Sequence, residues 1–269
     1  MRVNDLQRWV FGLGLFFSLN LALGAKCSKN LSRLVPHQER TFSDIYTELQ
    51  KLSPQGATKL ALQDDFDERI DPAGGGACAS TTAFNILQGL RLKSGKTALT
   101  PEPVLSEAFE SIPELLAGRV TNEQMTKLLA HLGRYLPDQA LEVSFERAPQ
   151  SKAVGDEAVG RVWKQFKEKQ LEMQPNEIKM VVFQVHNKDG ELLGRHFVVL
   201  KRKMEGKNAV VIDPSKPSKE LFYEFIDEPS QEGKSAATVL VRPDRVPHGR
   251  GWKMTLDTIF SVKINPTGR

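Results

Sequence analysis

Cysteine is scarce in this sequence, since Cys27 and Cys78 are the only two among 269 residues. Two thiols cannot complete a structural zinc site, and no two histidines have the i, i+3 or i, i+4 spacing that places two ligands on one helix face. A disulfide between the two cysteines is one interpretation if the chain is exported, but a domain of this size does not need one. The sequence therefore predicts no metal, no cofactor and no disulfide scaffold.

Long runs of one charge sign, internal repeats and low-complexity stretches are also absent. The hydrophobic fraction of 40% and the charged fraction of 26% are typical of a globular protein with a real core. The net charge of +4 is spread along the chain, and the basic triplet Lys201–Lys203 has no interleaved aromatic residues. Nucleic acid is therefore not an expected partner.

The first 25 residues have the pattern of a secretory signal peptide. Arg2 and Arg8 precede an apolar stretch from Trp9 to Leu23, and the small residues Gly24 and Ala25 follow. An uncleaved membrane anchor is the alternative, but polar and glycine residues interrupt the stretch, which is shorter than the roughly 20 apolar residues that span a bilayer. We expect a cleaved signal over 1–25, a periplasmic or extracellular mature protein, and no stable membrane insertion after signal removal.

The mature chain is expected to have a helical extension over 26–62 followed by one domain over 63–269. In the extension, Ser43 precedes apolar residues at helical spacing, and the acidic and glycine-rich segment 63–76 is expected to be a loop. The middle of the chain is expected to be helical. The predicted helices are 78–92, 104–116, 122–136 and 157–173.

After Pro175 the apolar periodicity changes to short β-branched runs separated by turn residues. The predicted strands are 180–186, 196–200, 209–213, 238–241 and 252–264. A helical first half followed by an antiparallel sheet from the second half defines the α+β class.

Cys78 is expected at the N-terminus of its helix, directly after a loop that contains Gly74–Gly76. Unpaired N–H groups and the helix dipole at this position favour a thiolate. The glycines also let a substrate backbone approach closely, so a backbone N–H could point at an oxyanion. The alternative is that Cys78 is a small buried hydrophobic residue and the glycines a plain loop.

His196 begins one predicted strand and Asp213 ends the next, and a short connection joins the two. If this hairpin pairs His196 directly with Asp213, the two side chains lie on one face with Cβ atoms about 4.5–5.5 Å apart. The carboxylate would then orient an imidazole that takes the proton of a thiol. Taken alone, His196 is typical of a histidine at a strand end on the surface, and Asp213 is typical of an Asp-Pro turn.

The remaining histidines are weaker candidates for a general base. His131 lies among leucines of a predicted helix, His186 ends a strand before a turn, and His37 and His248 lie in a terminal segment and a loop. None of the four has an acidic residue in a comparable position.

Three segments together resemble the bacteriocin-processing, double-glycine-type cysteine peptidases and their free-standing relatives within the papain-like fold. The segments are Cys78–Leu87, Gly194–Leu200 and Val210–Pro214. The resemblance implies a papain-like peptidase fold with Cys78 as nucleophile, His196 as base and Asp213 as its orienting partner. It also implies an exported peptidase that acts on a peptide or protein substrate.

The sequence departs from that family beside the nucleophile. Family members carry Gly-Pro after the cysteine, where this chain has Ala79 and Ser80, and a glutamine for the oxyanion hole a few residues before it. Gln63 is the nearest upstream glutamine, and it is expected to serve either as this donor or as a loop residue. Two alternative functions stay open: a transglutaminase-like acyl transferase, and a binding protein with a degenerate site.

Overall fold

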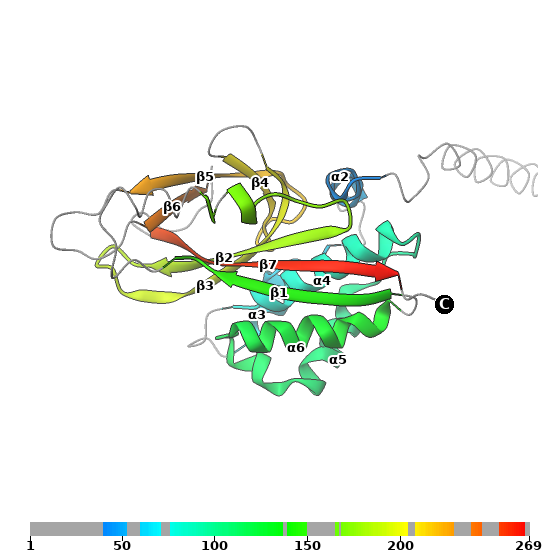
Figure 1. Cartoon of the computed structure of the whole chain (residues 1–269). Coiled ribbons are helices and arrows are strands. Elements are labelled where there is room, and N and C mark those ends of the chain that lie inside the picture. Colours follow the sequence, from blue (N-terminus) through cyan, green and yellow to red (C-terminus); the bar gives the residue numbers. More distant parts are fainter. Residues whose placement is uncertain are drawn as a thin grey trace, which may run out of the picture. The chain divides into compact units, whose positions relative to one another are not determined.

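A computed structural model describes residues 40–52, 60–70, 76–136, 139–149, 165–166, 168–203, 208–228, 238–243 and 253–266 (Figure 1). Residues from Thr41 onward belong to one compact unit. The expected signal peptide over 1–25, together with Cys27, His37 and His248, lies outside the described residues. No helix within the described ranges is long and apolar enough to cross a membrane.

The first half of the unit is mainly helical. Its helices are α2 (Phe42–Leu52), α3 (Asp64–Asp67), α4 (Cys78–Lys93), α5 (Pro101–Ser111) and α6 (Asn122–Leu132), with single 3₁₀ turns at Pro113–Ala117 and Gly133–Tyr135. The expected start of α2 at Ser43 is wrong, because Thr41 and Asp44 form the reciprocal hydrogen bonds that begin this helix. Most of the predicted helix 157–173 lies outside the described residues.

The strands form one antiparallel sheet of seven strands in the order β1-β7-β2-β3-β4-β5-β6, so the α+β class is confirmed. The strands are β1 (Gln139–Arg147), β2 (Glu177–His186), β3 (Leu192–Lys203), β4 (Asn208–Ile212), β5 (Leu221–Glu228), β6 (Thr238–Pro243) and β7 (Lys253–Pro266). β6 also pairs with β7, so the sheet closes on itself and β1 extends it on one side.

Two of these strands differ from the sequence prediction. The middle of the chain is not entirely helical, because β1 lies there and pairs with β7 along its whole length. β5, which is also absent from the predicted strands, pairs with both β4 and β6. In both strands the apolar residues support packing against neighbours that are distant in the sequence.

Residues of β2, β3 and β7 alternate between two hydrophobic cores, as the period of a strand requires. One core lies between the sheet and the helices, and Figure 1 shows α4, α5 and α6 together on one side of these strands. It takes Met180, Val182, Phe197, Val199 and Phe260 from the sheet. The other core fills the inside of the closed sheet and includes Val181, Phe183, Val198, Leu200, Val211 and Tyr223.

Helix α4 is buried on all sides from Cys78 to Leu90 and contacts α2, α5, α6 and β3. Three of its polar side chains hold neighbouring backbone. Asn85 bonds both the N–H and the C=O of Ala61, at 2.7 and 3.2 Å, and Gln88 does the same for Leu99. The Thr82 hydroxyl donates to the carbonyl of Phe197 at 2.8 Å. The helix is thereby fixed against β3 and against the segment that leads to Gln63.

We expect Asn85→Leu to lower the free energy of unfolding by about 2–4 kcal/mol, because it leaves two buried backbone groups of Ala61 without partners. Urea unfolding followed by circular dichroism measures this. The matched control is Asn265→Leu, which removes one exposed hydrogen bond to Glu142 and should cost within about 0.5 kcal/mol. Equal losses in the two variants would contradict the role given to Asn85.

Candidate active site

Cys78 is the first residue of α4, as the sequence predicts. Its thiol is free, 7% exposed, and donates to the main-chain carbonyl of Arg195 at 3.5 Å. No side chain caps the start of the helix; instead the N–H of Ala77 donates to the Asp67 carboxylate at 2.6 Å. The sulfur therefore lies where the helix dipole favours negative charge, directly against β3.

His196 and Asp213 form a buried pair beside this thiol. The imidazole Nε2 lies 3.0 Å from Oδ2 of Asp213, and the two residues are 6% and 0% exposed. Because Nε2 faces the carboxylate, the second ring nitrogen, Nδ1, is left for the thiol. The three residues that the sequence predicted as a set are therefore brought together from α4, β3 and the end of β4.

Asp213 is surrounded by donors that the sequence analysis missed. Its Oδ1 accepts from the backbone N–H and the hydroxyl of Ser215, at 2.8 and 2.7 Å, and its Oδ2 accepts from the hydroxyl of Tyr223 at 2.5 Å. Ser215 follows an Asp-Pro pair, which is a recognisable turn signal. Tyr223 lies in β5, which the sequence prediction lacked, so nothing local indicated it.

The hairpin of β3 and β4 brings His196 and Asp213 to one face through a bulge. Leu200 lies opposite Val211, whereas Arg202 lies opposite Val210, so Lys201 is an extra residue in β3. A shift of one residue moves a strand's side chains to the other face. Without the extra residue, Asp213 would fall on the face away from His196.

The direct pairing expected between His196 and Asp213 is wrong. With Val199 opposite Ile212, the continued register sets Asp213 against Val198, one two-residue step from His196. The two side chains therefore meet diagonally on the same face, which is within reach of an imidazole and a carboxylate.

The charges of the site follow from burial and from these contacts. Burial alone would lower the pKa of His196, but the Asp213 carboxylate and then Cys78 raise it to about 10. Burial alone would raise the pKa of Asp213, but His196, Tyr223 and Ser215 hold it below its usual range. Burial and the nearby Asp213 raise the pKa of Tyr223 well above its usual value, so its hydroxyl stays a donor. At neutral pH the site therefore holds an imidazolium beside the Asp213 carboxylate.

Gln63 lies close to this site because the segment before α4 folds back. Its backbone N–H donates to the carbonyl of Pro214 at 2.8 Å, and its side-chain amide donates to Asp67 at 3.3 Å. A Cβ on Gly76 would lie 2.7 Å from Nε2 of Gln63, and Gly76 has a φ of 143°, so this position requires glycine. The amide of Gln63 is therefore held between Asp67 and the residue two before Cys78.

The other described histidines are not part of the site. His186 contacts the carbonyl of Gly190 and the hydroxyl of Thr255, and His131 lies in α6. Within the described part of the chain, no group of three or more His, Cys, Asp or Glu residues is placed to hold a metal ion.

Comparison of the chain with protein-family models, with curated proteins and with solved structures finds no match to any of them.

We expect His196 to keep its second proton well above pH 6.5, the ordinary value, because Asp213 raises its pKa to about 10. The charged imidazole then stabilises the fold fully below pH 6.5, and this contribution is lost as the pH rises through about 10. Nitrogen-15 NMR of the imidazole, with urea unfolding at each pH, measures both quantities.

Asp213→Asn should bring this titration back towards pH 6.5, whereas Asp189→Asn, at an exposed turn carboxylate, should leave it unchanged. A wild-type His196 that titrates at or below pH 6.5 would contradict the ion pair.

Proposed function

We propose that this chain is an exported, thiol-dependent peptidase of the papain-like type, with Cys78 as nucleophile, His196 as general acid and base, and Asp213 as the residue that orients the imidazole. The observation that carries the proposal is that Cys78, at the start of α4, lies beside the buried pair of His196 and Asp213. Export rests on the charged, apolar and small-residue order of residues 1–25.

The geometry supports acyl transfer through the sulfur. The thiolate of Cys78 attacks the carbonyl carbon of a peptide bond, and the C=O electron pair moves to oxygen to give a tetrahedral oxyanion. As the oxyanion collapses, the C–N bond breaks and His196 gives its proton to the leaving amine. An acyl-thioenzyme and a free amine result.

In the second half of the reaction, His196 takes up a proton where before it gave one away. The imidazole, now neutral, takes a proton from a water molecule while the water oxygen attacks the thioester carbonyl. The C–S bond then breaks, which releases a carboxylic acid and restores the thiolate and imidazolium. Asp213 stays ionised throughout, because Ser215 and Tyr223 continue to donate to it.

Two groups are positioned to stabilise the oxyanion. The first is the backbone N–H at the start of α4, where helix N–H groups lack intrahelical acceptors. The second is the side-chain amide of Gln63, held near Gly76 by Asp67. The family that the sequence resembles uses a glutamine nearer to the cysteine, and the fold-back of the loop, which brings Gln63 next to Gly76, supports its assignment to this role.

The arrangement of the elements also supports the papain-like assignment. The nucleophile begins the most buried of the described helices, His196 comes from β3, which packs against that helix, and Asp213 follows the adjacent antiparallel strand β4. The hydrogen bond between Thr82 and Phe197 fixes the helix next to His196. Such a division, with the thiol on a helix and the base on a sheet, supports the papain-like fold that the resemblance implies.

We expect Cys78→Ala and His196→Ala each to reduce turnover of an internally quenched peptide library below about a thousandth of the wild-type rate. Asp213→Asn should cost less, since an amide still holds the imidazole but no longer stabilises the imidazolium. Mass spectrometry after treatment with an irreversible thiol-reactive peptidyl probe should find the label on Cys78.

Cys27→Ala is the matched control, because it removes the other thiol of the chain and should keep both activity and labelling. Full turnover by Cys78→Ala, or probe found on Cys27 in its place, would overturn the peptidase proposal.

We expect Gln63→Ala to lower kcat by about 10²–10³-fold if its amide donates to the oxyanion. Steady-state kinetics measures this, alongside urea unfolding. Gln139→Ala, which removes a side-chain hydrogen bond with Ser94 far from the site, should leave kcat unchanged. An unchanged kcat in Gln63→Ala would assign the oxyanion to the backbone N–H at the start of α4.

A further inference from the structure

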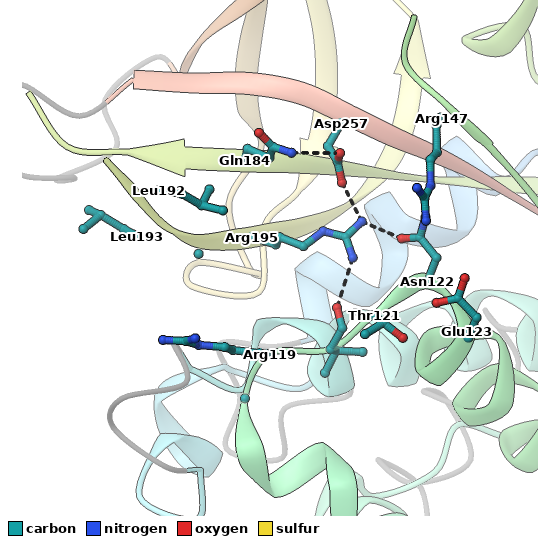
Figure 2. A pocket seen from close by; sticks show the side chains of 13 residues that line it. Arg119, Thr121, Asn122, Glu123, Arg147, Gln184, Leu192, Leu193, Arg195 and Asp257 are labelled. Atoms are coloured by element: carbon teal, nitrogen blue, oxygen red, sulfur yellow. Dashed lines mark hydrogen bonds and ion pairs between the residues drawn. The ribbon is translucent and has the colours of Figure 1, made fainter. Parts of the chain in front are cut away.

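A pocket of about 470 Å³ lies beside the candidate active site (Figure 2). One wall is the first part of β3, from Leu192 to Arg195, and the opposite wall is the segment that begins α6, including Arg119 and Asn122. Its volume lies within the range of about 300–1,000 Å³ that is typical of ligand sites.

The pocket and the thiol of Cys78 both contact Arg195 of β3. Arg195 lines it with its side chain, while the carbonyl of the same residue accepts the hydrogen bond from Cys78 and the next residue is His196. Successive residues of an extended chain are about 3.3 Å apart. A peptide whose scissile bond lies at Cys78 therefore brings a neighbouring side chain to this pocket.

The first residues of β3 offer an edge that can receive a peptide backbone. β4 pairs with β3 only from Val199 onward, and α4 already bonds the carbonyls of Arg195 and Phe197 through Cys78 and Thr82. Among the described strands, the stretch Leu192–Gly194 before these contacts pairs with β2 alone. An extended peptide can add to such an edge, where main-chain hydrogen bonds supply affinity and side-chain pockets supply specificity.

The floor of the pocket is a network of polar side chains that hydrogen-bond to one another. The Arg195 guanidinium donates to the carbonyl of Val120, to the amide oxygen of Asn122 and to the carboxylate of Asp257, and Gln184 donates to the same carboxylate. Figure 2 shows this network spanning the two walls. The floor is thereby fixed in place before a ligand binds.

The rim of the pocket is apolar at one end. Leu192 and Leu193 are 58% and 45% exposed, and both line the pocket. Single exposed leucines are ordinary, but two adjacent ones over a cavity offer apolar surface that a ligand can cover. In Figure 2, Leu192 and Leu193 lie at the left end of the pocket, across from Arg119 on the opposite wall.

The charges around the pocket oppose a cationic ligand. Arg119, Arg147 and Arg195 line it against Glu123 and Asp257, which leaves an excess of one positive charge. A lysine or arginine side chain brought into the pocket would meet this excess, and the Asp257 carboxylate is already paired with Arg195.

We infer that this pocket selects the substrate by taking an apolar side chain of about leucine size from a residue near the scissile bond, and by rejecting lysine and arginine at that position. The inference rests on the proposed function, because it deepens the role of the same site. It assigns Leu192 and Leu193 to contact the apolar side chain and Arg119 to contribute to the repulsion.

The test is a scan of internally quenched peptides with Leu, Ala or Lys at each position near the cleaved bond. At one position, kcat/KM for Leu should exceed that for Ala by about 10–100-fold, because one apolar side chain in a fitted pocket gives discrimination of this size. Lys should be cleaved more slowly than Ala there. The double variant Leu192→Asn with Leu193→Asn should lower kcat/KM for Leu far more than for Ala, so that the preference for Leu is lost. Arg119→Glu should raise the relative rate for Lys.

The matched control is Phe222→Asn, since Phe222 is 36% exposed on β5 and does not line the pocket. It should keep the Leu preference of the wild type. If peptides are cleaved but no position shows a Leu preference that the double variant removes, the inference is overturned while the proposed function stands.

If the wild type cleaves no peptide, the proposed function fails, and fluorescence anisotropy with fluorescein-labelled Leu and Lys peptides tests the pocket separately. Tighter binding of the Leu peptides, lost in the double variant, would support the inference. Equal binding of the two peptide sets would overturn it.

Discussion

The carboxylate of Asp213 is a fully buried negative charge, and such a charge is tolerated only where hydrogen bonds and an opposite charge replace water. Here the donors come from three separate places: β3 through His196, the turn after β4 through Ser215, and β5 through Tyr223. All three must be in position for the carboxylate to be buried. The imidazolium beside the thiol therefore depends on the pairing of three strands and on the bulge at Lys201 that sets their faces.

The thiol depends on a different set of contacts, because it belongs to the helical layer. Asn85, Gln88 and Thr82 hold α4 through backbone groups of three separate segments, so Cys78 has little freedom to move away from Arg195. The site thus lies where the core between helices and sheet meets the core inside the sheet. Each core positions one half of the reacting pair.

The sequence predicted the local parts of this site but not the long-range ones. The start of α4 at Cys78 and the strands that carry His196 and Asp213 follow from periodicity and turn residues. β1 has a strand signal of its own, because Leu141, Val143 and Phe145 alternate with polar residues, so this strand is predictable from the sequence. The bulge and the donation from Tyr223 have no local signal, because they exist only once distant strands pair.

The closed sheet also determines when the site can form during synthesis. β7 is the last described strand, yet it pairs with β1, β2 and β6, so neither core is complete until it has joined. Cys78 and Arg195 are already separated by 117 positions, and contacts of such long sequence separation form late and slowly. A chain still emerging from the ribosome would carry the thiol without its imidazolium partner. If the chain has the proposed activity, late assembly would then keep it from acting on its neighbours before its own fold is finished.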